Sequence, residues 1–156
     1  MKAALGLLAA LVFLPPLVAA SAVAVSTAPH RAPTTPLFSS VPPGGYLDRF
    51  PFGQCTWWAA YNRRVTWSGN ADDWLLNARA QGVETSLTPS PEAIVVYRPG
   101  GGYSELGHVA VVIAVAAGSY TVSEMNFIGW GQVNTRAVGW PDPHVRGFIP
   151  LQEVTR

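Results

Sequence analysis

The chain contains a single cysteine, Cys55, within the aromatic-rich segment Phe50–Tyr61. A turn with Pro51 and Gly53 precedes it, and helix-compatible residues follow as far as Arg64. We therefore expect Cys55 in the first turn of a helix, where unpaired backbone N–H groups and the helix dipole favour a thiolate over a thiol. The commoner fate of a free cysteine is that of a small buried hydrophobic residue. A histidine base with an orienting partner would favour the nucleophile.

Three histidines are available as a base for Cys55. His30 lies in a Pro/Ser/Thr-rich segment, and His144 lies in a turn-rich sequence typical of a surface loop. His108 begins the most apolar run of the chain, Val109–Val115, which predicts a buried strand that holds the imidazole rigidly, as a general base requires. Without polar partners nearby, a hydrogen-bonded core histidine would be the preferred interpretation of His108.

Polar partners stand on the next predicted strand, residues 120–127. Its two-residue period places Glu124 and Asn126 on one face, with a solvated face as the alternative explanation for them. A three-residue loop, 116–118, with Gly118 in the left-handed conformation would put both on the same side of the sheet as His108.

The length of that loop is therefore decisive. A three-residue loop pairs Val115 with Ser119, Ala110 with Glu124, and His108 with Asn126. A loop of two or four residues would separate His108 from both polar residues unless a bulge intervened.

Together these residues predict acyl transfer at an amide or ester. Cys55 would be the nucleophile, and His108 would take the thiol proton and return it to the leaving amine. Glu124 would hold the imidazole tautomer, with Asn126 as a second orienter or a substitute. The backbone N–H of Cys55 and the side chain of Gln54 would stabilise the tetrahedral oxyanion.

The elements that must position these groups form an α+β order, with helices first and strands after them. Trp74, Leu75 and Ala78 are expected on the inward face of the second helix. The predicted helices are 55–64 and 71–81, and the predicted strands are 83–87, 93–97, 107–115, 120–127, 132–138 and 146–149. We expect the N-terminal helices to pack on an antiparallel sheet of about five to six strands.

Composition limits the classes of function. The 156 residues carry a formal net charge of +1 and suit one domain, and from Gly45 onward eight arginines face nine acidic residues. Such a balance excludes the basic stripe of a nucleic-acid-binding protein. No cofactor is implied, and we expect a monomer.

Residues 1–24 have the basic start, apolar centre and small-residue site of a signal peptide, with an uncleaved anchor as the alternative. We expect a linker over 25–44, a catalytic domain over 45–150 and a tail over 151–156. The protein would then be secreted or extracytoplasmic, and would touch a membrane only through a retained leader.

Four segments resemble the CHAP family of cysteine- and histidine-dependent amidohydrolases and peptidases of bacteria and phages. They are Phe52–Trp57, Gly69–Trp74, Gly107–Val112 and Val122–Asn126. The resemblance implies a papain-like fold and cleavage of amide bonds in peptidoglycan. It matches Cys55, His108, Glu124 and Asn126 to the family's catalytic positions, and Gln54 to its oxyanion-hole donor.

Some members of this family carry an acidic calcium loop before the cysteine. Because that region offers only Asp48 here, we expect no metal site. The leading hypothesis is a secreted peptidoglycan hydrolase, either a muramoyl-alanine amidase or a cross-bridge endopeptidase. The alternatives are a thiol amidase or acyltransferase with a non-wall substrate, and a non-catalytic wall-binding module. Trp57 and Trp130 are candidate substrate-binding residues, with core packing as the alternative role.

Overall fold

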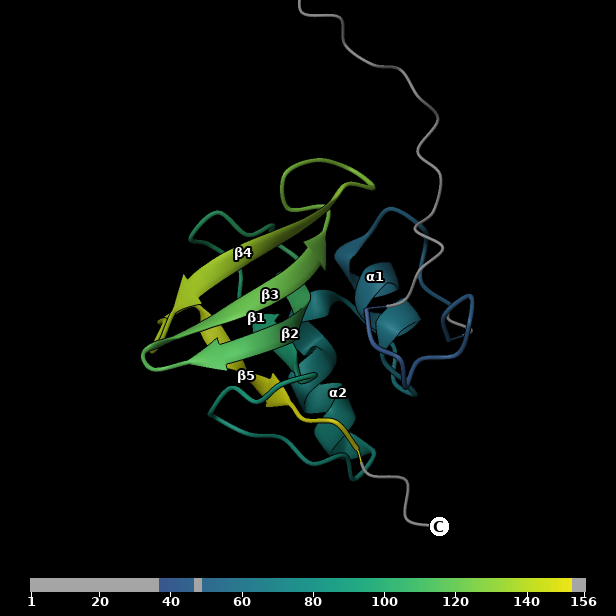
Figure 1. Cartoon of the computed structure of the whole chain (residues 1–156), viewed down its shortest axis with the longest axis horizontal. Coiled ribbons are helices and arrows are strands. Elements are labelled where there is room, and N and C mark those ends of the chain that lie inside the picture. The colour runs from purple at the N-terminus through teal and green to yellow at the C-terminus, as the bar shows by residue number, and fades with distance from the viewer. Residues whose placement is uncertain (1–36, 47–48, 153–156) are drawn as a thin grey trace, which may run out of the picture.

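A computed structural model describes residues 37–46 and 49–152 of the chain (Figure 1). Its elements in order are α1 (Cys55–Asn62), the 3-10 turn η1 (Ala71–Asp73), α2 (Trp74–Ala80), β1 (Ile94–Tyr97), β2 (His108–Ala116), β3 (Ser119–Met125), β4 (Val133–Gly139) and β5 (Val145–Ile149). The strands form one antiparallel sheet in the order β4-β3-β2-β1-β5. Both helices lie on the same side of this sheet, so the predicted α+β class is confirmed.

The first half of the central strand β2, residues 108–112, is buried on both of its faces. Val109 and Val111 point toward the helices and pack in one cluster with Ala59 and Trp74. Their neighbours Ala110 and Val112 belong to a second cluster on the opposite face, with Tyr120, Phe148 and other side chains of the sheet. Burial on both faces explains the apolar residues 109–112, and it gives His108 a rigid base, whereas residues 114–116 are exposed.

The first helix is shorter than predicted and ends at Asn62, because Arg63 has an extended backbone. The Asn62 side chain donates to the carbonyl of Trp58 and accepts from the backbone N–H of Leu37. Arg63 instead turns to pair with Glu92, at 3.1 Å. These side-chain bonds compete with a further helical turn.

The second predicted helix begins as the 3-10 turn η1 and continues as α2. Its inward face is the predicted one, since Trp74, Leu75 and Ala78 are all buried. Gly82 follows it with a φ of +76°, the left-handed conformation expected after a helix end.

The predicted strand 83–87 was wrong, because only Ser86 makes an isolated bridge, to Phe148. The hydroxyl of Thr85 accepts a hydrogen bond from Arg79, and that of Ser86 bonds Thr88. Local bonds of this kind draw the backbone away from regular pairing.

The hairpin of β2 and β3 has the predicted register near the site, but its turn is shorter than predicted and a bulge compensates for the difference. Its turn has two residues, Ala117 and Gly118, so Ala116 pairs with Ser119, and the predicted pair of Val115 with Ser119 was wrong. A β-bulge between Val112 and Ala114 then restores the predicted register deeper in the hairpin, where Val112 pairs with Val122 and Val111 with Ser123. The bulge thus compensates for the shorter turn and leaves His108 on the side of Glu124.

The N-terminal part of the described chain also packs on the domain. The side chain of Val41 is buried, and Leu37 contacts the helix side of the core. Residues 39, 40 and 42–44 are exposed, so these contacts involve only part of this segment, and the linker over 25–44 stays a prediction. The predicted signal peptide, the rest of the linker, His30, Asp48 and residues 153–156 lie outside the described residues. In the part of the chain that the structure does describe, neither helix has the length and hydropathy needed to cross a bilayer.

The indole of Trp58 connects α1 to β3 by donating to the hydroxyl of Ser123 at 3.0 Å, with both side chains buried. Replacing Ser123→Ala leaves this N–H without an acceptor. We expect the free energy of unfolding to fall by about 1–3 kcal/mol, measured by urea denaturation. The matched change Ser119→Ala, at the half-buried start of the same strand, serves as the control. Equal losses in the two variants would contradict the role given to this bond.

Candidate active site

The thiol of Cys55 lies at the first residue of α1, at the base of a cleft of about 340 Å³. Only 8% of the residue is exposed, and its side chain is hydrogen-bonded to His108. The backbone at Thr56 and Val109 adds hydrogen bonds to the sulfur. The structure thus brings the helix start and the first residue of β2 together.

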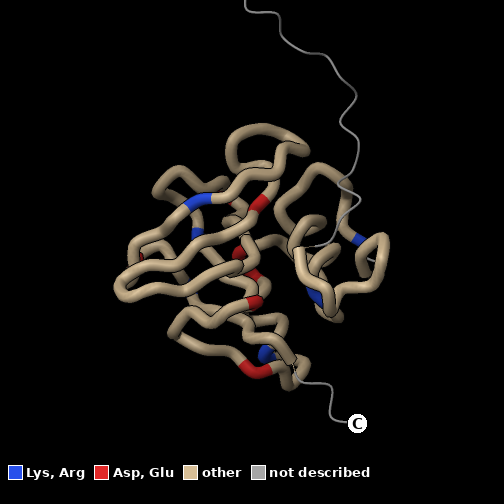
Figure 2. The backbone as a smooth tube through the Cα atoms, viewed as in Figure 1, with Lys and Arg blue, Asp and Glu red and all other residues tan. Residues whose placement is uncertain are grey.

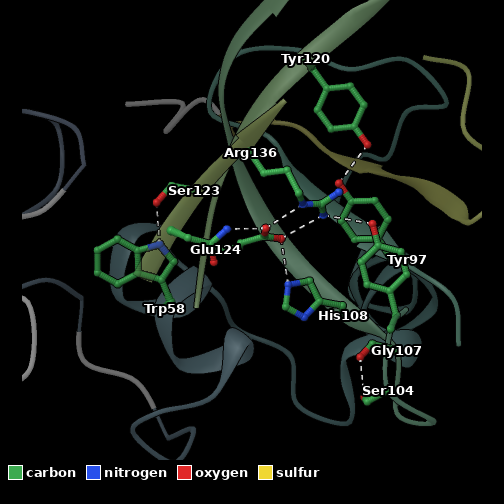
Figure 3. Close-up of polar contacts among 11 residues, drawn as sticks. Trp58, Tyr97, Ser104, Gly107, His108, Tyr120, Ser123, Glu124 and Arg136 are labelled. Carbon is green, nitrogen blue, oxygen red and sulfur yellow. Dashed lines mark hydrogen bonds and ion pairs between the residues drawn. The ribbon is translucent and has the colours of Figure 1, made fainter. Parts of the chain in front are cut away.

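Behind the imidazole lies a fully buried carboxylate. The Nε2 atom of His108 is 3.1 Å from Oε2 of Glu124, which has no exposed surface (Figure 3). Because Nε2 faces the carboxylate, Nδ1 is the ring nitrogen left for Cys55. The three side chains therefore form a relay from thiol to imidazole to carboxylate, contributed by α1, β2 and β3.

The carboxylate of Glu124 is held by two further residues of the neighbouring strand β4. Arg136 donates to Oε1 from Nε at 2.9 Å and to Oε2 from Nη2 at 3.1 Å, and Asn134 donates to Oε1 at 2.9 Å. The same Arg136 Nη2 donates to the hydroxyl of Tyr103 at 3.1 Å. Such a bidentate guanidinium contact favours the ionised carboxylate and fixes the orientation of its plane.

These contacts set the charges of the site. Burial alone would raise the pKa of the Cys55 thiol, but the hydrogen bond and charge of His108, together with backbone hydrogen bonds at Val109 and Thr56, lower that pKa. Burial alone would lower the pKa of His108, whereas its bonds to Cys55 and Glu124 raise it to about 9. Burial would likewise raise the pKa of Glu124, but its bonds to His108, Arg136 and Asn134 lower it to about 2. The lowered pKa of Cys55 and the raised pKa of His108 both favour a thiolate beside an imidazolium.

Asn126 lies outside the strand in which it was predicted, because β3 ends at Met125 and Asn126 has a φ of +64°. Asparagine tolerates this left-handed conformation better than most residues. Its side-chain N–H donates to Oε1 of Gln54 at 3.1 Å, and no contact joins it to His108 among the described hydrogen bonds. Asn126 thus orients the side-chain amide of Gln54. The N–H₂ group of Gln54 remains available to the cleft, which Gln54 lines.

Tyr103 covers the imidazole from the glycine-rich loop between β1 and β2. Its ring stacks on His108 with centroids 5.6 Å apart and planes inclined by 21°, and on Tyr97 at 4.4 Å. These contacts and its bond to Arg136 hold Tyr103 in place, and its side chain also lines the cleft. A larger hollow of about 500 Å³ lies between the ends of α1 and β5 and contains neither Cys55 nor His108.

Of the two candidate substrate-binding residues, Trp130 is the more exposed, at 53%. Its indole lies against Gly53, where a Cβ atom would come within 2.4 Å of the ring. Trp57 is half-buried and stacks on Tyr61 at 4.9 Å. Both indoles meet the ring of Phe52 edge-on, so the three aromatic side chains form one cluster, and none of them is among the residues that line the cleft at Cys55.

Sequence reasoning missed Arg136, Asn134 and Tyr103. The sequence pattern does indicate Arg136 and Asn134, because both alternate with the buried Val138 and so lie on the inner face of β4. An inward arginine requires a carboxylate partner. Tyr103 gave no comparable signal, because it lies in a loop.

No group of three or more potential metal-ligating side chains occurs among the described residues. Asp48, on which the expectation about calcium depended, is not among them. The expectation that the site needs no metal therefore stays a prediction.

The family model of the CHAP domain matches residues 45–126, more than half of the chain. The chain belongs to the CHAP domain family. The match contains Cys55, His108, Glu124 and Asn126 and ends at the last of these.

Three proteins resemble this CHAP domain. A protein of Streptococcus mutans serotype c, whose name gives it as a hydrolase, is 37% identical over 108 residues, which cover 64% of this chain and 46% of that protein. Probable autolysin LDP of Staphylococcus aureus is 34% identical over 98 residues, which cover 57% of this chain and 33% of that protein. The crystal structure of an N-acetylmuramoyl-L-alanine amidase from Staphylococcus aureus matches with a TM-score of 0.51 at 33% identity. The match covers 56% of this chain and 27% of the amidase chain. The chain thus spans less than half the length of each relative, and the papain-like α+β fold is confirmed.

Glu124→Gln removes the negative charge that stabilises the imidazolium of the CHAP domain. The wild-type His108 should hold its proton up to about pH 9, and the variant should lose it at a lower pH, with a pKa decreased by at least about 1. An NMR titration of the imidazole resonances measures this directly. Glu92→Gln, which removes a carboxylate paired with Arg63 instead, should leave the His108 pKa in place. An unchanged pKa in Glu124→Gln would contradict the assignment.

Proposed function

We propose that the protein is a secreted hydrolase that cleaves an amide bond of peptidoglycan through a Cys55 thiolate. The observation that carries the proposal is the contact of Cys55 with a charged His108, itself held by a buried carboxylate, at the base of an open cleft. Membership of the CHAP family and the relatives named as an autolysin and an N-acetylmuramoyl-L-alanine amidase support the substrate.

In the first half of the proposed reaction, the sulfur of Cys55 attacks the carbonyl carbon of the scissile amide. The oxygen becomes an oxyanion, stabilised by the backbone N–H of Cys55 and the side-chain N–H₂ of Gln54. The C–N bond breaks as His108 donates its proton to the leaving amine. A thioester to Cys55 and a neutral imidazole remain.

In the second half, the neutral imidazole of His108 takes a proton from water, and the resulting hydroxide attacks the thioester carbon. The C–S bond breaks, the acyl group leaves as a carboxylic acid, and the thiolate–imidazolium pair is restored. Glu124 holds the imidazole in one tautomer throughout. Asn126 acts as a positioning residue, and its bond to Gln54 supports a role at the oxyanion hole rather than at His108.

Export fits this substrate, because peptidoglycan lies outside the cytoplasmic membrane. We therefore propose that residues 1–24 act as a signal peptide and that the domain works in the extracytoplasmic space as a monomer.

The proposed reaction predicts a specific product from purified peptidoglycan. Incubation should release new amino groups without new reducing sugar ends, and mass spectrometry of the fragments should identify the amide that is cut. Cys55→Ala, which removes the nucleophile, should lower the rate by at least about 10³-fold. Reducing ends in the product, or full activity in Cys55→Ala, would overturn the proposal. A protein that binds peptidoglycan without cleaving it would instead be a wall-binding module.

Trp130 is proposed to contact the wall polymer beside the scissile bond, with Trp57 supporting it through Phe52. Trp130→Ala should raise KM for peptidoglycan several-fold and leave the reactivity of Cys55 unchanged, because the indole lies outside the relay. The change Leu87→Ala, at an exposed side chain away from the cleft, controls for loss of apolar surface. An unchanged KM in Trp130→Ala would contradict the proposed contact with the polymer and would mean that this indole serves only in packing.

A further inference from the structure

The cleft above Cys55 is uncharged apart from its catalytic pair. Among the described residues that line it, the side chains other than Cys55 and His108 are aromatic, aliphatic, amide or hydroxyl groups, with several glycines. No Asp, Glu, Lys or Arg is among these lining residues. A bound substrate therefore meets hydrogen-bonding groups such as Gln54 and Asn70, but no fixed ionic partner.

The charges behind the cleft are already paired with each other. The guanidinium of Arg136 is bonded to both oxygens of Glu124 and to the hydroxyl of Tyr103, and it lies 4.3 Å from the centroid of the Phe127 ring. The positive charge of His108 is shared between the thiolate and the same carboxylate. None of these cations can turn to a substrate without breaking the relay.

The other arginines of the described chain are not among the residues that line this cleft. Arg63 pairs with Glu92 and lines the larger hollow, and Arg146 pairs with Asp72 beside α2. Figure 2 shows the few charged positions scattered over the fold rather than gathered at one site. Arg49 precedes the lining residue Phe50 but does not itself line the cleft.

A carboxylate placed in this cleft would lose water without gaining a cation, and it would lie near the Cys55 thiolate. We propose that the cleft selects amides whose neighbouring groups carry no free carboxylate, such as stem-peptide segments in which that carboxyl group is itself amidated. This inference rests on the proposed function and specifies its substrate.

The test uses soluble muropeptides, each prepared with its carboxyl groups free or converted to primary amides by carbodiimide and ammonia. The wild-type protein should cleave the amidated form with a kcat/KM at least about tenfold higher, because an unpaired ion in the cleft opposes binding. Equal rates, or a preference for the free acid, would overturn the inference while leaving the proposed function intact.

A cation added to the cleft should reverse this selection. Leu106 lines the cleft and is 58% exposed, so Leu106→Arg places a guanidinium at its mouth. We expect the ratio of the two rates to shift toward the free acid by about tenfold, and neither the uncharged Leu106→Gln nor the remote Leu87→Arg should shift it. The same shift in Leu87→Arg would mean that net charge, not the cleft, sets the ratio, and would overturn the inference.

Cleavage of neither form would contradict the proposed function rather than the inference. The affinities of the two muropeptide forms for the Cys55→Ala protein would then decide the inference alone. Tighter binding of the amidated form supports a neutral cleft, and equal binding overturns it.

Discussion

Glu124 is a carboxylate without exposed surface, and the three side chains bonded to it determine how the site works. A buried carboxylate is tolerated only when its oxygens are well hydrogen-bonded, and here Arg136 and Asn134 supply that from β4. Because they keep Glu124 ionised, it can in turn keep His108 protonated beside Cys55. Removing this support would leave an ordinary thiol next to an ordinary histidine.

The rest of the fold serves to bring these groups within reach. The first half of β2 is buried on both faces and places His108 at its start, while the bulge in the hairpin aligns β3 so that Glu124 lies behind the ring. The bond from Trp58 to Ser123 fixes α1, and with it Cys55, against the same strand. The ring of Tyr103 stacks on His108, and its hydroxyl accepts a hydrogen bond from Arg136, which ties the loop between β1 and β2 to these groups.

Local patterns in the sequence predicted much of this arrangement. The helix start at Cys55 and the strand after His108 follow from turn chemistry and from an apolar run, which depend on neighbouring residues alone. The two-residue turn with its compensating bulge depends on how β2 packs between two other strands, and local pattern does not report it. Asn126 bonds a residue 72 positions away. The partner of Arg136 becomes evident only once β4 is known to pair with β3.

The contacts of Cys55 with His108 lower the pKa of its thiol, so the folded protein should hold a thiolate at a pH where a free cysteine is still protonated. The rate of alkylation of Cys55 by iodoacetamide at pH 6 measures this most directly, with the denatured chain and His108→Ala as references. We expect the folded protein to react at least about tenfold faster than either, because an ordinary thiol with a pKa of about 8.5 is almost wholly protonated at that pH. A folded protein that reacts no faster than the denatured chain would contradict it.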